Sequence, residues 1–358
     1  MKLLMLLLPM SAVFAQANLG FELGTFEGWQ ARAADSIFTE LTLTNPISNR
    51  HQILTGAVFD PFIDDEVQVV CPDGKFFVKL GNELTGNQSE SLESKFLVEQ
   101  GKEILIYRYS VVLDEPWHPS EERPGLTIRI HDSDNPCYFH RVEMTDSLGP
   151  FQTREINFRK IRFCNAFAGA FDLSDSVGEF CKIELRTNDC SLGGHFGYAY
   201  VDLIQLPKLT EIGFCDKTIT VTAPDGFQSY FWDGVEGTNT KIIREPRNGQ
   251  IVSCRLQGYF GCPVEIRYRL KKLGASECRN YPLFFTPNAD GINDCWKPNG
   301  SWIRIFIYNR FGQLISSLSQ NDCWNGIASG RAAPSDDYWF VAIDANGSQS
   351  TGHFSLVR

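Results

Sequence analysis

Two histidines lie in segments whose residue types suit ligand binding. His195 follows a Gly-Gly pair and is flanked by aromatic residues, and glycine permits positive φ or a close approach of the backbone to a ligand. His118 follows Trp117 in a proline-rich loop, where an aromatic ring can stack on the apolar face of a sugar. Trp117, His118 and His195 are therefore candidate ligand-binding residues. The alternative is that each side chain packs within its own domain.

Carboxylates are abundant, but the sequence lacks the motifs of common enzymes. It contains no GxSxG, HExxH, P-loop or GxGxxG sequence. Asp64-Asp65-Glu66 and Glu121-Glu122 are interpreted as solvated loop charge. A glycosidase pair of carboxylates comes together only in the fold, so a hydrolase stays open as an alternative. The sequence itself predicts no catalytic residue and no required cofactor.

The first residues have the composition of a secretory signal. Lys2 supplies a positive charge, Leu3–Leu8 form a short apolar core, and small residues follow up to Ala17. The apolar run is well short of the ~20 residues that span a bilayer, and no later segment is apolar enough to do so. We therefore expect residues 1–17 to be a signal peptide for Sec export and the mature chain to have no transmembrane segment.

The cysteines are informative because of this export signal. The chain has 11 of them, without any CxxC pair and without clustering with His along the sequence, so a zinc site has little support. In an exported protein they are expected to form disulfides. Because the number is odd, at least one thiol is left free or pairs outside the chain.

The composition is that of a folded, acidic protein. Of its 358 residues, 43% are hydrophobic and 13% are aromatic, which supplies packed cores and excludes disorder and coiled coil. The net charge is −10, and residues 18–206 alone carry 16 Lys and Arg against 29 Asp and Glu, a net of −13. Nucleic acids and anionic membranes require a basic surface, so neither is an expected partner.

Apolar residues recur along the chain with the period of β-strands. Residues 126–131 (LTIRIH) alternate strictly, so Thr127, Arg129 and His131 are expected outward and the residues between them inward. Short strands separated by frequent Gly and Pro turns predict an all-β protein built of sandwiches. Similar runs occupy residues 103–113, 182–187, 198–206, 218–222, 251–256, 264–270 and 303–308.

Two breaks divide the mature chain into three segments. Pro207-Lys208 follows one strand, and residues 274–282 are polar and interrupt the pattern again. We therefore expect a first domain at 18–206, a middle domain at 209–278 and a C-terminal module at 279–358, all within the usual size range of domains.

The C-terminal module contains an ordered series of short motifs. Residues 284–294 read FFTPNADGIND, residues 305–312 read IFIYNRFG, and a Trp-Asn-Gly turn, an aromatic strand and a short final strand follow. This series resembles the gliding-motility-associated C-terminal domain of the Bacteroidetes, the type B sorting signal of the type IX secretion system. The resemblance implies a β-sandwich read by the secretion machinery in the outer membrane, with delivery to the cell surface or beyond. The sorting-motif residues are Phe285, Thr286, Pro287, Asn288, Asp290, Gly291, Asn293, Asp294, Tyr308, Asn309, Arg310, Gly312, Trp324 and Gly326.

The module departs from the family pattern at a few positions. Ala289 stands where the family usually has Gly, Phe311 where Trp is common, and Cys295 and Cys323 where Cys is unusual. Each of the two cysteines precedes a Trp in adjoining turns, so they are candidates for a disulfide.

The oxygen-bearing side chains of Asn288, Asp290, Asn293 and Asp294 loosely resemble a calcium loop. No Glu closes such a loop at the twelfth position. We therefore favour a tight turn in which Asn and Asp cap backbone N–H groups.

The first domain begins Asn18-Leu19-Gly20-Phe21-Glu22, followed by Gly28-Trp29, and contains a run that ends Tyr200-Val201-Asp202. These segments resemble the opening and closing strands of the galactose-binding-like jelly rolls of secreted carbohydrate-binding modules. In those relatives the Glu and the Asp commonly share a structural calcium, which implies Glu22 and Asp202 as candidate metal ligands. Two ordinary edge carboxylates are the alternative. Residues 190–200 and 124–137 also resemble stretches of large surface proteins that carry the same sorting domain.

In the middle domain, residues 227–232 (FQSYFW) resemble the S-Y-x-W strand of Ig-like and PKD-like sandwiches, in which the Trp fills the core. A Cys215–Cys262 disulfide would tie the ends of this domain, with Cys254 and Cys278 as a second candidate pair, although sequence does not fix the connectivity. The domain is interpreted as a spacer.

Two functions of different classes follow. The first is a non-catalytic exported surface protein with an adhesion role, in which the jelly roll binds a glycan or a surface protein. The second is a secreted glycan-active hydrolase whose catalytic carboxylates lie in the first domain. The order of the domains and the missing motifs favour the first, for which no cofactor is required and a structural calcium is the candidate metal.

Overall fold

The computed structural model of the chain is almost entirely β-structure, which confirms the predicted all-β class. The described residues form two compact units, unit 1 up to Lys272 and unit 2 from Leu273 onward. No helix in the described part of the chain has the length and apolarity needed to cross a membrane. The structure describes residues 18–36, 39–69, 74–114, 118–119, 122–131, 135–143, 151–274, 281–288, 292–298, 302–319, 322–328, 330–345, 347 and 349–358.

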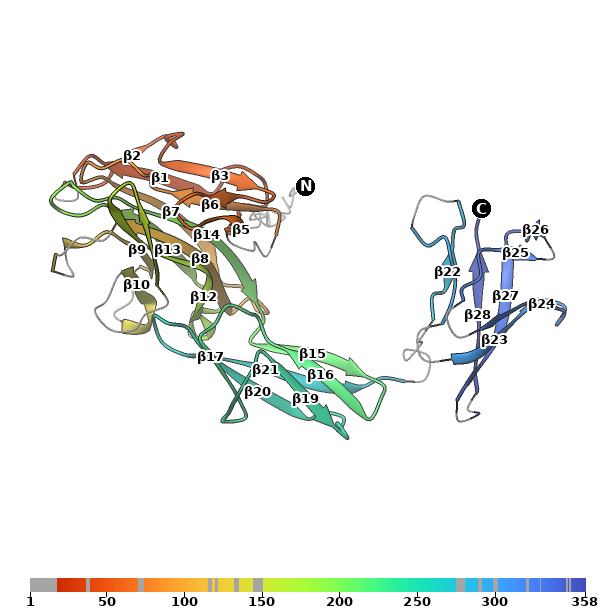
Figure 1. Cartoon of the computed structure of the whole chain (residues 1–358). Coiled ribbons are helices and arrows are strands. Elements are labelled where there is room, and N and C mark those ends of the chain that lie inside the picture. The colour runs from red at the N-terminus through yellow and green to blue at the C-terminus, as the bar shows by residue number, and fades with distance from the viewer. Residues whose placement is uncertain are drawn as a thin grey trace, which may run out of the picture. The chain divides into compact units, whose positions relative to one another are not determined.

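The first sandwich of unit 1 consists of two six-stranded antiparallel sheets that share one hydrophobic core (Figure 1). Sheet A has the order β10-β9-β13-β7-β1-β2, with bounds Phe139–Glu143, Gly125–Ile130, Phe180–Asn188, Ser89–Leu97, Trp29–Ala34 and Thr42–Thr44. Sheet B has the order β11-β12-β8-β14-β6-β3, with bounds Gln152–Ile156, Arg159–Asp172, Ile104–Asp114, Gly197–Leu206, Phe76–Leu80 and His51–Thr55. A small ladder joins β4 (Phe59–Asp60) to β5 (Asp64–Gln68), and short 3-10 turns lie at Pro136–Tyr138 and Ser174–Ser176.

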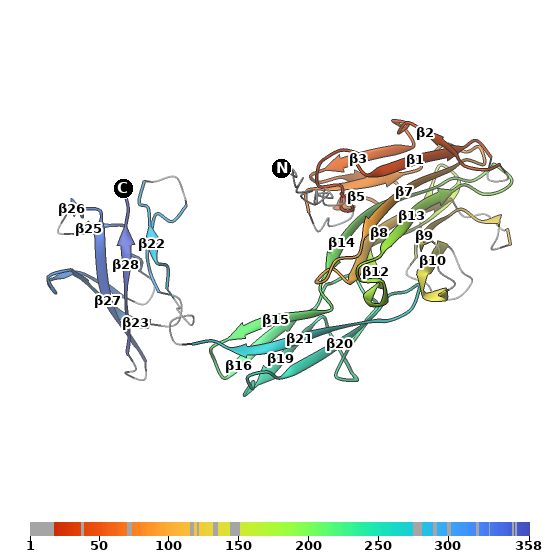
Figure 2. The same ribbon diagram turned by 180° about the vertical axis from the view of Figure 1, so that it is seen from behind.

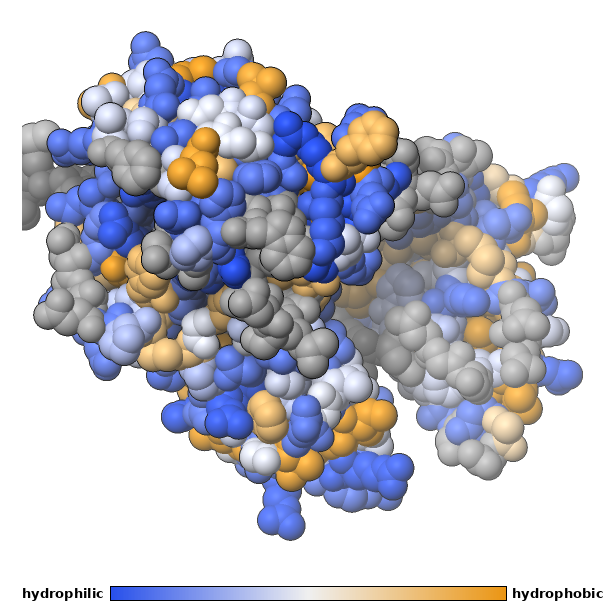
Figure 3. Space-filling view, turned by 60° about the vertical axis from the view of Figure 1, so that its left-hand side comes forward, coloured by the Kyte–Doolittle hydropathy of each residue, from blue (hydrophilic) through white to orange (hydrophobic). Residues whose placement is uncertain are grey.

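The alternation of apolar and polar residues in the sequence correctly predicts which side chains form the core of this sandwich. In β9 the side chains of Leu126, Ile128 and Ile130 are buried between the sheets. Arg129 and its neighbours of the same parity lie on the opposite face of sheet A, because successive side chains of a strand point to opposite faces. Hydrophilic side chains cover most of the surface visible in Figure 3, and the exposed hydrophobic residues form small patches among them.

The N-terminal segment is a turn, whereas the sequence predicts an opening strand at residues 18–22. Strand structure begins only at Trp29. The Asn18 amide donates to the carbonyls of Thr25 and Glu27, and its Oδ1 accepts the N–H of Leu23. These local bonds satisfy the backbone groups that a strand would offer to a neighbour, so the segment folds back on itself.

A second sandwich follows in the same unit (Figure 2). Its larger sheet has the order β15-β21-β20-β17-β18, with bounds Leu209–Phe214, Val264–Lys272, Ile251–Gln257, Ser229–Trp232 and Val235–Gly237. The smaller sheet pairs β16 (Thr218–Thr222) with β19 (Thr240–Arg244). Trp232 is buried in the core, as the S-Y-x-W resemblance implies.

The second sandwich is docked on the first. One hydrophobic cluster combines Ile104 and Ile106 of β8 and Ala168 and Ala170 of β12 with the core side chains of the second sandwich. A disulfide between Cys137 and Cys262 joins the two sandwiches covalently, and Arg108 on β8 forms an ion pair with the Asp225 carboxylate. Residues up to Lys272 therefore form one body.

The Cys137–Cys262 disulfide corrects the predicted Cys215–Cys262 pair. β15 runs parallel to β21, with Phe214 opposite Lys272, so Cys215 lies near the end of β21 and Cys262 lies before its start. At about 3.3 Å per residue, roughly 30 Å of strand separates them. Cys215 is disulfide-bonded, but not to Cys262. Cys254, predicted to pair with Cys278, is a buried free thiol, and Cys278 lies outside the described residues.

His140 is buried at the junction of the two sandwiches. Its Nδ1 is hydrogen-bonded to the hydroxyl of Tyr107, and its ring stacks on Phe171 at a centroid distance of 4.4 Å. Gly261 packs so closely against the ring that a larger side chain there would collide with it. Burial lowers the pKa of His140 to about 4, and the backbone of Cys137 opposes this only in part.

We expect unit 1 to lose about 3 kcal/mol of stability as the pH falls from 7 to 4. The unfolded chain binds a proton at His140 below pH 6.5, whereas the folded chain does not bind it until about pH 4, so acid favours the unfolded state. Urea unfolding of wild type and His140→Gln across this range tests the prediction. Between pH 7 and pH 4 the free energy of unfolding should fall by about 3 kcal/mol less in the variant than in wild type. Equal falls in the two proteins would contradict the prediction.

Unit 2 is a five-stranded sheet with a small hairpin. The sheet order is β22-β28-β27-β23-β24, with bounds Phe284–Phe285, Gln349–Leu356, Asp336–Asp344, Trp302–Asn309 and Leu314–Ser319. The hairpin pairs β25 (Ile327–Ala328) with β26 (Arg331–Ala332). Aromatic side chains dominate its core, led by Trp296 and Trp324, which are both buried and bridge each other through their backbones.

Candidate functional site

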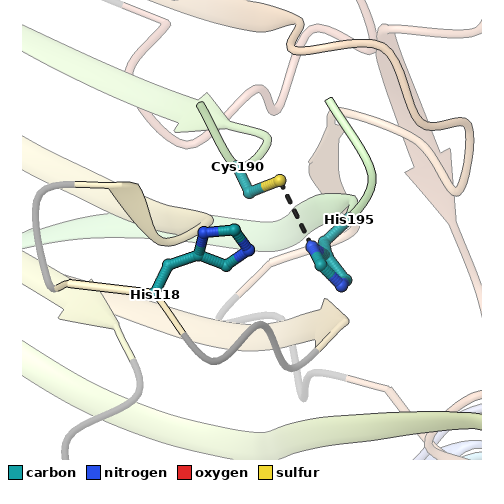
Figure 4. Close-up of side chains that lie close together, drawn as sticks. All are labelled: His118, Cys190 and His195. Atoms are coloured by element: carbon teal, nitrogen blue, oxygen red, sulfur yellow. Dashed lines mark hydrogen bonds between the residues drawn. The ribbon is translucent and has the colours of Figure 1, made fainter. Parts of the chain in front are cut away.

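The structure brings His118 and His195 together at one end of the first sandwich, beside Cys190 (Figure 4). The two rings meet edge to face with centroids 5.3 Å apart. The Cys190 Sγ lies 3.3 Å from Nδ1 of His195, and one ligand atom from each of the three side chains lies within 4.8 Å of the others. Trp117, the third predicted ligand-binding residue, lies outside the described residues.

The cluster is assembled from the loops that leave β8 and β13. A tight turn fixes the second loop, because the N–H of Cys190 donates to the carbonyl of His195 and Gly193 adopts a φ of +72°. Ser191 N–H donates to the carbonyl of Glu122, and the Arg123 guanidinium donates to the carbonyl of His118. These bonds tie the two loops together and fix their side chains in place.

Burial and one nearby carboxylate act on the His195 ring, and another carboxylate lies beside His118. The pKa of His195 is lowered by burial, despite the Asp114 carboxylate, which opposes the shift. His118 Nδ1 lies 3.5 Å from the Glu122 carboxylate, which orients this ring. Imidazole and thiol groups in contact can form a hydrogen bond or hold a metal ion.

Glu22 and Asp202 both lie close to Gly20. The Glu22 carboxylate accepts the N–H groups of Lys75 and Phe76. The buried Asp202 carboxylate accepts the N–H of Leu203. The two carboxylates thus lie in one region, and their role as calcium ligands stays a prediction.

A network of charged side chains covers the face of sheet A that points away from the core. Glu93, Glu184 and Arg129 are opposite one another on β7, β13 and β9. Glu184 pairs with Arg129, and Glu93 accepts from Arg32 and Lys182 at 2.9 and 3.0 Å. Both carboxylates are therefore neutralised by cations.

Three arginines on adjacent strands form the positive part of this network, and we call them the arginine face: Arg129 on β9, Arg141 on β10 and Arg186 on β13. Arg129 and Arg141 each pair with a glutamate. Within the described part of the chain Arg186 makes no ion pair, and its Nε donates to Ser89 Oγ at 3.0 Å. Burial is the main cause of its lowered pKa; the nearby charges of Arg129 and Arg141 add to this lowering, and the carboxylates of Glu184 and Glu90 oppose it.

The carboxylates of this network are poorly suited to donate a proton. Burial alone would raise the pKa of Glu93, but the hydrogen bonds from Lys182 and Arg32 outweigh burial and lower it. His131 lies 3.4 Å from Glu184 and 3.7 Å from Glu93, and burial lowers its pKa. The ligand atoms of His131, Glu93 and Glu184 lie close enough together to hold a metal ion. Both carboxylates, however, are already paired with Arg or Lys side chains.

The sorting motif of unit 2 is spread over turns that meet at one end of the sheet. Asp294 caps the N–H of Asn288, and Thr286 N–H donates to the carbonyl of Asn293. This is the geometry of a capped turn. Asp290 and Gly291 lie outside the described residues. Phe285 is buried in the core, with Pro287 two residues on.

The second half of the motif forms the β23–β24 turn and the Trp-Asn-Gly turn. Asn309 Oδ1 accepts the N–H groups of Phe311 and Gln313, and Gly312 has a φ of +73°. Tyr308 is the last but one residue of β23, and Arg310, just after the strand, pairs with an aspartate of β27. Trp324 is buried, and Gly326 accepts from the Arg358 guanidinium. Cys295 and Cys323 are disulfide-bonded, with Cα atoms 5.6 Å apart.

Sequence reasoning named His118 and His195 but missed their partner and the arginine face. Cys190 lies five residues before His195, and the fold brings the loop of His118 to both. The sequence does contain a signal for the arginine face. In β13, charged residues alternate with apolar ones at Lys182, Glu184 and Arg186, which is the pattern of a strand with one charged face.

Solved structures with some likeness to this chain include carbohydrate-binding modules and a glycoside hydrolase. TmCBM61 in complex with β-1,4-galactotriose is 11% identical, covers 52% of this chain and 95% of its own, and has a TM-score of 0.26. Caldicellulosiruptor saccharolyticus CBM27-1 in complex with mannohexaose is 13% identical, with 53% and 94% covered and a TM-score of 0.25. The glycoside hydrolase domain of Endo-D from Streptococcus pneumoniae R6 is 11% identical, with 85% and 37% covered and a TM-score of 0.24. Likenesses this low assign neither a fold nor a ligand.

No curated protein matches the chain. Residues 279–356 match the family model of the CHU_C type IX secretion signal domain. This match confirms the resemblance of the C-terminal motifs to a sorting domain and implies export by the type IX machinery to the cell surface or the exterior. The C-terminal part of the chain is a type IX secretion signal domain of the CHU_C family.

Proposed function

We propose that the chain is a non-catalytic surface protein whose first sandwich binds an anionic glycan on the arginine face. The sorting domain supports delivery to the outside of the cell, where glycans and surface proteins are the available ligands. The observation that carries the proposal is the gathering of Arg129, Arg141 and Arg186 on one sheet face.

These arginines gather in a part of the chain that is acidic overall. Residues 18–206 carry a net charge of −13, yet here three guanidinium groups gather, and the charges of Arg129 and Arg141 lower the pKa of Arg186 although Glu184 and Glu90 oppose them. Like charges held together destabilise the unliganded protein, and a bound anion relieves that repulsion. A site of this kind is expected where an anion is recognised.

The chemistry of the face fits an acidic sugar. Guanidinium groups bind carboxylates and sulfates with paired hydrogen bonds. Thr127 and Asn188 lie beside Arg141 and hydrogen-bond to it at 3.4 and 3.3 Å, and such groups suit sugar hydroxyls. The expected ligand is therefore a polysaccharide that contains uronate or sulfate groups.

The hydrolase alternative needs a protonated acid beside a second carboxylate. Glu93 and Glu184 are opposite each other on neighbouring strands, but the lowered pKa of Glu93 leaves it without a proton to donate at neutral pH. This geometry supports binding rather than cleavage. Incubation with the bound polysaccharide should release no reducing ends, and their release would favour the hydrolase instead.

Replacing Arg186 with Gln should weaken binding of an anionic polysaccharide about 10- to 100-fold. A hydrogen bond to a charged group contributes about 1.5–3 kcal/mol, and Gln keeps the bond to Ser89 within reach while removing the charge. Calorimetry with polygalacturonate and with a sulfated galactan measures the effect, and neutral galactan is the control ligand. Affinity should also fall as salt is raised above 0.1 M, because screening shortens the range of the charges.

The matched control is Arg247→Gln, which removes an exposed arginine of the second sandwich. It should bind as wild type does. Equal affinities of wild type and Arg186→Gln would overturn the role of the arginine face, and binding of neutral galactan alone would assign a neutral glycan.

A further inference from the structure

We propose that His118, Cys190 and His195 bind one zinc ion and leave a fourth coordination position open. The sequence gives this site little support, because its cysteines are not clustered with histidines along the chain. The fold nevertheless joins two loops that are about seventy residues apart and brings the three side chains together.

The donor set matches zinc. Thiolate sulfur and imidazole nitrogen are the ligands that Zn²⁺ takes in proteins, at about 2.3 Å and 2.0–2.1 Å. Tetrahedral bonds of these lengths place ligand atoms about 3.5 Å apart. The Cys190 Sγ and His195 Nδ1 are already 3.3 Å apart, and the third ligand atom lies within 4.8 Å of both. These distances exceed the tetrahedral separation by at most about 1.3 Å, so a small shift at His118 completes the geometry.

The burial of the three residues favours an open site. Cys190 is fully buried, whereas both histidines are partly exposed. Three protein ligands with one solvent-facing position are typical of zinc sites that bind a water molecule or an exogenous ligand. A hard cation such as Ca²⁺ is disfavoured because it prefers oxygen ligands.

The surroundings supply the support that metal ligands require. Glu122 lies 3.5 Å from Nδ1 of His118, so it can orient that ring as carboxylates do beside metal-bound histidines. The carbonyl of the same residue accepts the N–H of Ser191, which holds the two loops in register. The other described free thiols, Cys164, Cys181 and Cys254, belong to no such cluster among the described residues.

Cobalt substitution of the full chain tests the site. The protein, with its disulfides intact, is freed of metal by chelation and titrated with Co²⁺. Binding at Cys190 should produce a thiolate-to-cobalt charge-transfer band in the near ultraviolet together with visible ligand-field bands, and equimolar Zn²⁺ should remove both. Cys190→Ser should lose the charge-transfer band, and the matched control Cys181→Ser, which removes another buried thiol, should keep it.

The remaining variants separate coordination from a structural role. Glu122→Gln should weaken Co²⁺ binding about 10- to 100-fold without changing the spectrum, as expected for a residue that orients a ligand. Glu99→Gln, which removes an exposed carboxylate paired with Lys102, should have no effect. His118→Asn should weaken binding while the metal-free protein unfolds at the wild-type temperature. Absence of a thiolate band in wild type, or its persistence in Cys190→Ser, would overturn the proposal and leave a plain S–H···N hydrogen bond.

Discussion

Replacing Cys137 and Cys262 with Ser will lower the free energy of unfolding of unit 1 by about 2–5 kcal/mol, the usual loss when a native disulfide is removed. The bond closes a loop with a sequence separation of 125 residues, and the entropy that a cross-link removes from the unfolded chain grows with loop length. It also holds Gly261 against the His140 ring at the junction of the two sandwiches. Loss of the disulfide therefore weakens the docking of the two sandwiches and also removes the constraint on the unfolded chain.

Guanidinium unfolding of the oxidised full chain measures this effect. The matched control is the Cys295→Ser/Cys323→Ser pair, whose disulfide spans 28 residues of unit 2 and should leave the transition of unit 1 unchanged. An unchanged midpoint for unit 1 in the Cys137→Ser/Cys262→Ser protein would show that apolar docking alone holds the two sandwiches together.

Replacing Trp296 with Ala should destabilise unit 2 by about 3–5 kcal/mol. The indole is fully buried, stacks on Phe354 at a centroid distance of 3.6 Å and donates from Nε1 to the carbonyl of Pro282. The substitution therefore removes a large packed surface together with the hydrogen bond to the Pro282 carbonyl. A unit of this size has little stability to lose, so we expect it to be largely unfolded at 37 °C.

Calorimetry of the full chain should show loss of the unit 2 transition, with the unit 1 transition retained. Trp339→Ala is the control, since that ring lies in the same sheet but is 42% exposed, and it should cost under about 1 kcal/mol. In a host with type IX machinery, Trp296→Ala should also block export of the chain. Normal export of an unfolded unit 2 would mean that the machinery reads the motif as a peptide.

The strands were predictable because each shows its pattern locally. Residues 103–113, 198–206 and 264–270 alternate or run apolar, and each forms a strand with bounds shifted by only a few residues. Residues 18–22 failed because β-like residue types there are overridden by the hydrogen bonds of the Asn18 side chain. That competition is visible only once the turn has formed.

The sites were less predictable because they depend on pairing between distant segments. Cys262 has a partner in the first sandwich, which no pattern within the middle domain indicates. Cys190 and His195 lie close in sequence. Their contact with His118 requires β8 and β13, which belong to different sheets, to end at the same end of the first sandwich. The arginine face requires β9, β10 and β13 to be neighbours in sheet A, an order that alternation alone does not reveal.

The Cys137–Cys262 bond also decides how a pulling force crosses the protein. Tension applied along β21 from its C-terminal side reaches Cys262 and passes through the disulfide to Cys137, next to β10, the edge strand that carries Arg141. Strands β10 to β20 lie between the two cysteines in the chain, so the covalent path of the force bypasses them. Reduction of the bond would place those 125 residues in series, adding roughly 400 Å of extensible chain. The disulfide thus makes the protein a short, stiff tether in an oxidising medium and a long, compliant one in a reducing medium.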